Sequence, residues 1–254
     1  MSWNPERYLA FGDHRTRPAV DLLARVPLDA PARVVDLGCG PGNSTALLCA
    51  RWPDAEVTGV DNSAEMLARA QGSGLRARWL EADIAGWLAG APCDLIYSNA
   101  ALQWLPDHAT LLPRLLGQLA AGGVLAVQMP RNFAAPSHAL LGAVASEGAW
   151  AERLAPRLLS AVATPEWYYD LLAPLGAALD IWESEYLQVL DGPDPVLEWT
   201  RSTALRPVIE VLDPDERARF EQDYAARLRA AYPRRPDGRT LFPFRRLFIV
   251  AQAT

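Results

Sequence analysis

The sequence predicts an α/β fold in which an open, mostly parallel seven-stranded sheet is flanked by helices, with a helical insertion late in the chain. Three observations predict this class. Short apolar runs typical of buried strands alternate with runs of helical apolar spacing over residues 33–130. A glycine-rich turn joins the first strand to the next helix. One further strand-like run lies within the insertion and another follows it, and strand–helix alternation of this kind builds a doubly wound sheet.

The expected elements follow one another along the first half of the chain. A helix is expected at 17–26, where Pro18 suits a first helical turn. A later helix follows Ser63, whose hydroxyl is suited to an N-cap. The other elements are expected as strands at 32–37, 55–61, 77–83, 93–100 and 122–130 and as helices at 43–52, 63–71 and 108–119.

The second half has a different character. Residues 132–232 are rich in Ala, Leu, Trp and Tyr at helical spacing and are interrupted by prolines. A strand-like run at 180–190 predicts a sixth strand within this region. The run at 244–253 predicts the last strand, either at an edge or inserted antiparallel.

Composition excludes several classes of function. The 254 residues carry a net charge of −6, which gives no general attraction to nucleic acid or to an anionic membrane surface. No apolar run approaches the roughly 20 residues that span a bilayer. The three cysteines, Cys39, Cys49 and Cys93, match neither a zinc site nor a disulfide framework. We therefore expect a cytoplasmic protein, without a bound metal, that acts on a small molecule.

The strongest motif is VVDLGCGPGN at residues 34–43, which ends the first strand. Gly38, Gly40 and Gly42 allow a tight turn and a close approach to a ligand at the start of the next helix. The third glycine falls one residue early for a dinucleotide fingerprint. Asp36 would repel a pyrophosphate but suits the cationic methionine group of S-adenosylmethionine (SAM). A turn with purely conformational glycines is the alternative.

Polar residues after the following strands complete the predicted cofactor site. Asp61 is placed to bind both ribose hydroxyls, although it is also placed to cap the next helix. Asp83 is placed to accept from the adenine amino group, with Ile84 against the ring, although a solvated loop acid is the alternative. The full predicted set is Asp36, Gly38, Gly40, Gly42, Asp61, Asn62, Asp83, Ile84, Asn99 and Ala100.

Together VVDLGCGPG, GVD, EADI and SNAALQWL resemble class I SAM-dependent methyltransferases, which have a Rossmann-like fold, over about residues 30–130. A narrower resemblance extends over nearly the whole chain. WNPERYLAF, RPAVDLLARVPL, DLGCGPGNST, SNAALQWLPDH, GVLAVQMP, ALRP and RLFIVAQ are similar to the trans-aconitate 2-methyltransferase family. The region at 145–165 departs most from that pattern.

This resemblance implies transfer of the SAM methyl group to one carboxylate oxygen of trans-aconitate, giving a monomethyl ester and S-adenosylhomocysteine. The sulfonium is already activated and the carboxylate already ionised, so positioning and desolvation suffice and no catalytic residue is expected. A polycarboxylate requires cation donors, and arginine matches a carboxylate bidentately. The expected substrate-binding residues are Arg206, Arg246, Gln103, Trp104, Tyr8 and His138, with Arg15, Arg17 and Tyr168 as weaker candidates.

The organisation expected is one domain over residues 1–254, and a monomer is favoured. Residues 1–30 form an N-terminal lid and helix, and 31–130 the SAM-binding core. Residues 131–235 form a helical substrate-covering region with one strand, and 240–254 the final strand. Trp3, Tyr8 and Phe11 either close over SAM or anchor the N-terminus. His14 and His108 are interpreted as loop residues without an assigned partner.

Three alternative functions and one rival substrate class, nucleic acid, remain to be weighed. The same core serves methyltransferases of other small-molecule acceptors. An NAD-dependent oxidoreductase is disfavoured by Asp36 and by the glycine spacing. A non-catalytic SAM-binding protein lacks support because no interaction patch, charged tail or repeat is visible. Methylation of a nucleic acid base is disfavoured because the fourth strand runs into Ser98-Asn99-Ala100-Ala101 rather than a base-flipping motif.

Overall fold

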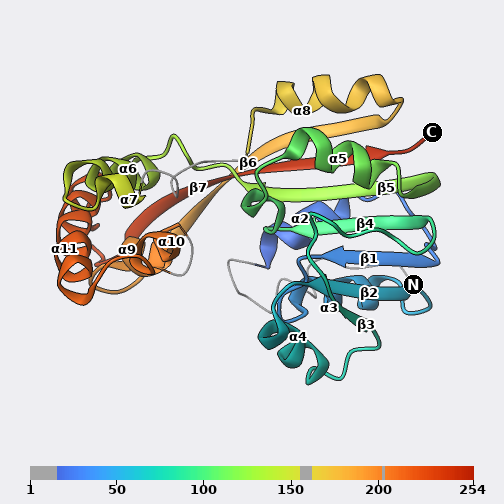
Figure 1. Cartoon of the computed structure of the whole chain (residues 1–254), viewed down its shortest axis with the longest axis horizontal. Coiled ribbons are helices and arrows are strands. Elements are labelled where there is room, and N and C mark those ends of the chain that lie inside the picture. The colour runs from blue at the N-terminus through green and yellow to red at the C-terminus, as the bar shows by residue number, and fades with distance from the viewer. Residues whose placement is uncertain (1–15, 155–161, 202–203) are drawn as a thin grey trace. The chain divides into compact units, whose positions relative to one another are not determined.

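A computed structural model describes residues 16–154, 162–201 and 204–254. Its sheet has seven strands in the order β3-β2-β1-β4-β5-β7-β6 (Figure 1). The strands are β1 Arg33–Leu37, β2 Glu56–Asp61, β3 Arg78–Glu81, β4 Cys93–Asn99, β5 Leu119–Pro130, β6 Ala178–Leu190 and β7 Thr240–Gln252. The predicted fold class is confirmed.

Strand β7 runs against its neighbour β5, whereas the strand pairs among β1 to β5 are parallel. Parallel pairing joins β1 to β2 and β4, β2 to β3, and β4 to β5. β7 then pairs antiparallel with β5 and lies between β5 and β6. The last strand is therefore inserted and not an edge strand, and the carboxyl ends of the five parallel strands meet at one edge of the sheet.

The helices begin where the sequence expects them, within a few residues. Ser63 Oγ accepts a hydrogen bond from Met66 N at 3.3 Å and caps α4. Asp107 caps α5 through Thr110 N at 3.1 Å. The helices that accompany the sheet are α2 Arg17–Ala24, α3 Asn43–Arg51, α4 Ala64–Gln71, α5 His108–Leu116 and α8 Pro165–Leu172, with the 3₁₀ turns η1 Leu102–Trp104 and η3 Ala173–Leu175.

The chain divides into two compact units. The first unit contains the described residues up to Pro130, those between 161 and 184, and Arg246–Thr254. The second contains the remainder: α6 Pro136–Glu147, α7 Ala151–Leu154, α9 Pro195–Arg201, α10 Arg206–Ile209, α11 Pro214–Ala231 and the adjoining parts of β6 and β7. The one-domain organisation with its four segments stays a prediction.

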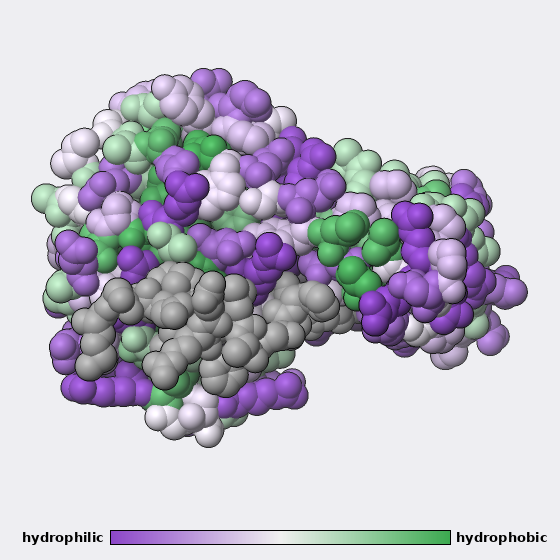
Figure 2. Space-filling view, turned by 180° about the vertical axis from the view of Figure 1, so that it is seen from behind, coloured by the Kyte–Doolittle hydropathy of each residue, from purple (hydrophilic) through white to green (hydrophobic). Residues whose placement is uncertain are grey.

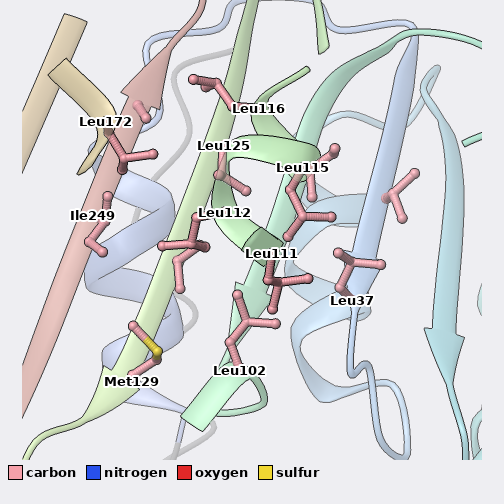
Figure 3. Packing of buried hydrophobic residues seen from close by; sticks show 14 of the residues in the cluster. Leu37, Leu102, Leu111, Leu112, Leu115, Leu116, Leu125, Met129, Leu172 and Ile249 are labelled. Carbon is pink, nitrogen blue, oxygen red and sulfur yellow. The ribbon is translucent and has the colours of Figure 1, made fainter. Parts of the chain in front are cut away.

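The core of the first unit lies between the sheet and α5. Figure 3 shows leucines of α5 directed at side chains of β5, including Leu125 and Met129. Tyr168 and Leu172 of α8 are fully buried in the same cluster. Burial of these two side chains places residues 162–184, which the sequence analysis assigned to the covering region, with the first unit.

The second unit has a core of its own. Phe220, Tyr224 and Leu228, on one face of α11, are buried against α6, α9 and the amino-terminal half of β7. Helix α11 begins with a capping box in which Asp213 accepts from Glu216 N at 2.8 Å. This helix is long, strongly capped and amphipathic, which accounts for its formation from a sequence of low hydrophobicity.

The face in Figure 2 is largely hydrophilic, with smaller groups of hydrophobic residues between charged ones. Within the described residues, none of the helices combines the length and the apolar character needed to cross a bilayer.

Candidate active site

The glycine loop between β1 and α3 has a backbone that side chains would not permit. Gly38, Gly40 and Gly42 have positive φ values of 73°, 54° and 93°. The amides of Gly38 and Cys39 both donate to Val60 O, at 2.8 and 3.1 Å. A Cβ on Gly38 would lie 2.2 Å from Ala101 Cβ. Position 38 therefore requires a glycine for two reasons: the backbone φ is positive, and the segment after β4 leaves no room for a side chain.

Asp36 lies fully buried under this loop. Its Oδ2 accepts hydrogen bonds from Ser44 Oγ at 2.8 Å and Thr45 Oγ1 at 2.6 Å. Its Oδ1 is buried and has no hydrogen-bond partner within the described residues. Burial raises the pKa of Asp36 to about 6, although the two hydroxyl donors oppose the rise. A buried carboxylate with a spare acceptor fits a cationic ligand group, as the methionine end of SAM requires.

Asp61, at the end of β2, holds the loop from the other side. Its Oδ2 accepts from Gly40 N and its Oδ1 from Ser63 N, both at 2.9 Å. The cap of α4 is Ser63 itself, so Asp61 orders the turn before the helix. Each carboxylate oxygen has a second lone pair, which leaves acceptor capacity for ribose hydroxyls. The neighbouring Asn62 is exposed.

The loop after β3 carries the residues expected at the adenine. Asp83 is exposed, and its Oδ1 accepts from Ala85 N at 2.9 Å. Ile84 is half-buried, and its Cδ1 would lie 3.5 Å from a Cβ on Gly38, so it borders the glycine loop. Arg114 of α5 donates to the carbonyls of Ile84 and Ala85 at 2.9 and 2.8 Å. Sequence reasoning missed Arg114, because no local pattern links it to this loop.

The segment after β4 forms a tight turn. Ala100 has φ 56°, the single positive value at a non-glycine position among the described residues. Its N–H donates to Gln128 O at 2.9 Å, and its carbonyl accepts from Gln103 Nε2 at 2.7 Å. Asn99 Oδ1 and Gln103 Oε1 are buried acceptors without a partner in the described part of the chain. Trp104 is 60% exposed.

Arg246 and Arg206, the first two candidates for the acceptor, have opposite surroundings. Arg246 of β7 is 4% exposed, and its Nη1 donates to Gln128 Oε1 at 3.3 Å. Arg206 begins α10 in the second unit, where its side chain is 70% exposed and its Nε donates to Glu210 Oε1 at 2.9 Å. The substrate role of each arginine stays a prediction.

His138 of α6 also belongs to the second unit. Its Nδ1 lies 3.2 Å from Ser137 Oγ, and its ring contacts Phe133 edge to face. Burial lowers the pKa of His138 to about 4, so the ring is neutral at physiological pH. A neutral imidazole offers a carboxylate a hydrogen bond but no positive charge.

The interpretation of His108 as a loop residue is wrong, whereas the helix expected from residue 108 does begin there. His108 is the first residue of α5 and is buried. Its Nε2 lies 2.8 Å from Leu102 O, and its Nδ1 lies 2.6 Å from the Tyr168 hydroxyl. Because a carbonyl only accepts, Nε2 carries the proton and Tyr168 donates to Nδ1. Tyr168 is thus occupied in the core rather than exposed to a substrate.

The structure provides little evidence on the remaining weaker candidates for substrate binding. Arg17 lies exposed on α2, 3.9 Å from Asp21. Tyr8 and Arg15, together with Trp3, Phe11 and His14, lie outside the described residues. Within the described residues, no group of three or more His, Cys, Asp or Glu side chains is arranged to hold a metal ion.

The strand order, the glycine loop and the buried acid beneath it define a class I methyltransferase with a Rossmann-like fold. Residues 34–123 match the methyltransferase domain family. The chain belongs to the trans-aconitate 2-methyltransferase family. It is 55% identical to the trans-aconitate 2-methyltransferase of Azoarcus sp. (strain BH72), covering 98% of each chain. It is 52% identical to that of Methylobacterium radiotolerans, again over 98% of both.

Solved structures share the fold at low sequence identity. The YcgJ protein from Bacillus subtilis aligns with a TM-score of 0.63 and 13% identity, covering 93% of this chain and 98% of that one. The Haemonchus contortus phosphoethanolamine N-methyltransferase 2, solved in complex with S-adenosyl-L-methionine, aligns with a TM-score of 0.56 and 15% identity, covering 98% and 57%.

Proposed function

We propose that this enzyme transfers the methyl group of SAM to one carboxylate of trans-aconitate, giving a monomethyl ester and S-adenosylhomocysteine. The observation that carries the proposal is the similarity to trans-aconitate 2-methyltransferases over nearly the entire chain. The first unit supports it with a buried acid at the glycine loop and a buried arginine on β7.

The cofactor end of the site is assigned to residues of four strand ends. Asp36 Oδ1 is suited to the methionine ammonium and Asp61 to the ribose hydroxyls. Asp83 and Ile84 are suited to the adenine, while the Gly38–Gly42 turn allows close approach of the backbone. Asn99 Oδ1 is a buried acceptor at the end of β4, and the strained turn at Ala100 leads into Ala101, which approaches Gly38. When bound, SAM supplies an activated methyl group on a sulfonium.

The chemistry demands little of the protein beyond orientation. A lone pair of the carboxylate oxygen forms the O–CH₃ bond as the C–S bond breaks, and the bonding pair stays on sulfur. Both opposite charges disappear and no proton moves, so no general base is required. The protein contributes by holding the carboxylate in line and by removing water from it.

The acceptor requires positive charge that this acidic chain supplies locally. Arg246 is the leading candidate, because a buried guanidinium gains more from an anion than an exposed one does. We assign Arg206, Gln103, Trp104, Tyr8 and His138 supporting roles, and we assign residues 131–235 the role of covering the acceptor. A structure with S-adenosylhomocysteine and a tricarboxylate tests the covering role, which fails if these helices leave the acceptor exposed.

A reducing cytoplasmic setting fits the three free thiols among the described residues. Burial raises the pKa of Cys39, Cys49 and Cys93, so none of them is an activated thiolate.

The deciding experiment is product analysis by mass spectrometry after incubation with methyl-labelled SAM. The acceptor panel holds trans-aconitate, cis-aconitate, citrate, isocitrate and several monocarboxylic acids. Preferential formation of a labelled trans-aconitate monoester is the expected result. Labelling of a different acceptor would transfer the assignment to that compound, and binding of NAD without SAM binding would overturn the class of reaction.

A further inference from the structure

Gln128 of β5 lies within the GVLAVQMP motif but is not among the site residues expected from the sequence. Its side chain is fully buried, and its amide Oε1 accepts from Arg246 Nη1 at 3.3 Å. This contact fixes the orientation of the amide, because the reversed amide would place its NH₂ group against a guanidinium. Gln128 Nε2 then has no hydrogen-bond partner within the described residues.

The strand registers place Gln128 in a row of polar side chains on one face of the sheet. Asp36 pairs with Tyr97, and Asn99, two residues further along β4, pairs with Gln128. Gln128 pairs in turn with Phe248, two residues from Arg246. Since directly paired residues and residues two apart share a face, Asp36, Asn99, Gln128 and Arg246 face the same way. We call these four residues the polar row.

The opposite face of the same strands is apolar, which separates the row from the core. Leu125, Val127 and Met129 alternate with Gln128 along β5 and pack against α5 (Figure 3). On the face of the polar row, Tyr97 OH donates to Ala19 O of α2 at 2.6 Å. The polar row therefore lies on the same face of the sheet as Asp36 and extends across the strands from β1 to β7.

Gln128 is also tied to the cofactor side through its backbone. Its carbonyl accepts from Ala100 N at 2.9 Å, in the turn that approaches Gly38. Adjacent strands are about 4.8 Å apart, so β5 lies about 10 Å from β1. Gln128 therefore lies beyond the acid proposed for the methionine group, in the direction of Arg246.

A buried amide donor without an acceptor costs free energy, unless a ligand supplies the acceptor. Beside a buried guanidinium, that ligand is an anion, and a carboxylate accepts from both donors at once. We propose that Gln128 Nε2 and Arg246 bind one carboxylate of a polycarboxylate acceptor, and that a different carboxylate of the same molecule receives the methyl group.

The distinction between the two carboxylates has a chemical reason. Charge-assisted hydrogen bonds stabilise the lone pairs of an anion, and a carboxylate held by an arginine is thereby a weaker nucleophile. The reacting carboxylate needs the opposite environment, with few hydrogen-bond donors around it. Acceptors with a single carboxylate should accordingly react poorly, because they either miss the anchor or use their nucleophile to fill it. This inference rests on the proposed function.

Two variants of Gln128 isolate the amide donor. Gln128→Glu retains an oxygen for Arg246 but replaces the donor with a second, negatively charged oxygen. Gln128→Leu removes both polar atoms. The matched control is Gln118→Leu: Gln118 Nε2 is likewise buried without a partner in the described chain, but Gln118 lies at the amino end of β4 and β5, where its carbonyl accepts from Cys93 N. Thermal unfolding of all three variants accounts for losses of stability.

Binding is measured by calorimetry with tricarballylate, a saturated tricarboxylate, in the presence of S-adenosylhomocysteine. We expect Gln128→Glu to weaken this binding about 10- to 100-fold, the range for one hydrogen bond to a charged group, while SAM affinity and the Gln118→Leu control stay unchanged. In turnover, KM for trans-aconitate should rise far more than kcat falls, and the preference for polycarboxylates over monocarboxylates should narrow.

Unchanged tricarballylate binding in Gln128→Glu would overturn the anchor, and so would an equal loss of SAM affinity, which would indicate a structural role. The polycarboxylate preference is the ratio of kcat/KM for a polycarboxylate to kcat/KM for a monocarboxylate. Because both values come from one enzyme preparation, a misfolded fraction lowers both equally and leaves the ratio unchanged. If the wild-type enzyme methylates none of the acids, the proposed function fails by itself. Tricarballylate binding that depends on Gln128 would in that case still support the anchor.

Discussion

Two candidate functional charges of the first unit, Asp36 and Arg246, are buried, whereas in the second unit arginines lie at the surface against carboxylates. Asp36 accepts from two hydroxyls, and Arg246 donates to an amide. In the second unit Arg227 binds Glu147 and Asp223, and Arg229 binds Asp194 at 2.6 Å. A charge already neutralised in water has little to offer a ligand, while burial in a low-dielectric environment strengthens the attraction between a charge and a counter-ion.

This difference ranks the residues of the candidate site. Hydrogen bonds from arginines lower the pKa of Glu147 and Asp194, as expected for structural ion pairs. Asp36 shows the reverse, because burial raises its pKa to about 6. A group whose environment disfavours its own charge is a better candidate for function than one whose environment satisfies it. Substitutions of these residues should differ in effect according to that ranking.

Gly38→Ala should have the largest effect. The added Cβ would lie 2.2 Å from Ala101 Cβ at a φ of 73°, so the loop and the segment after β4 must separate. We expect a loss of about 3 kcal/mol in the free energy of unfolding, together with loss of measurable SAM binding. Urea unfolding and calorimetry measure the two effects.

Gly74→Ala is the matched control, because Gly74 has a φ of 72° but open space around its Cβ position. It should cost only about 1 kcal/mol, the strain of the backbone alone. Equal losses in the two variants would show that the close approach of Ala101 contributes nothing.

Arg246→Met should come next. The substitution keeps much of the buried apolar volume but removes the charge, so KM for trans-aconitate should rise about 100-fold while SAM affinity stays constant. Steady-state kinetics and calorimetry with S-adenosylhomocysteine provide the measurements. Arg246→Lys should recover part of the loss, because lysine restores the charge without the planar fork. An unchanged KM in both variants would remove Arg246 from the acceptor site.

Asp36→Asn should weaken SAM binding about tenfold, because the ammonium loses a buried counter-charge. Its effect on stability has the opposite sign. The folded pKa of about 6 lies above the unfolded value, so Asp36 contributes stability that is present at low pH and lost as pH rises through about 6.

The SAM-free Asp36→Asn variant should therefore keep its melting temperature better than the wild type as the pH rises from about 4 to about 6, as paired melting curves would measure. A parallel decline in the two proteins would contradict the buried, uncompensated state of Asp36. Wild-type SAM affinity should also fall below pH 6, when Asp36 takes up a proton.

Arg206→Ala should have the smallest effect. Its exposed pair with Glu210 is worth less than about 0.5 kcal/mol, so thermal stability should hardly change. If Arg206 assists the acceptor, KM for trans-aconitate should rise about 3- to 10-fold, well below the effect at Arg246. Arg217→Ala, which removes another exposed arginine of the second unit, is the control. Identical kinetics in the two variants would indicate that the positive charge that binds the acceptor comes from the first unit.

The two units also differ in how far the sequence predicted them. In the first, strong strand–helix periodicity located all five parallel strands within a few residues, and Ser63 was identified as a cap before α4. The glycine motif predicted a tight turn, and Gly38, Gly40 and Gly42 adopt positive φ values there. The limits of the second unit are not predictable in the same way: residues 162–184 are expected with the covering helices but pack with the first unit, because the sequence does not reveal that Tyr168 and Leu172 are buried in its core.

The sequence by itself determined the fold class, the cofactor loop and the family, because these depend on local periodicity, on backbone freedom and on motifs that are continuous in the chain. Only the tertiary structure decided that His108 is a core histidine bonded to Tyr168, and that Gln128 lies beside Arg246, 118 residues away. Strand register and burial set such pairs, and both depend on the whole sheet. The sequence specifies which side chains carry a charge, but only folding brings together the partners that determine what each charge can bind.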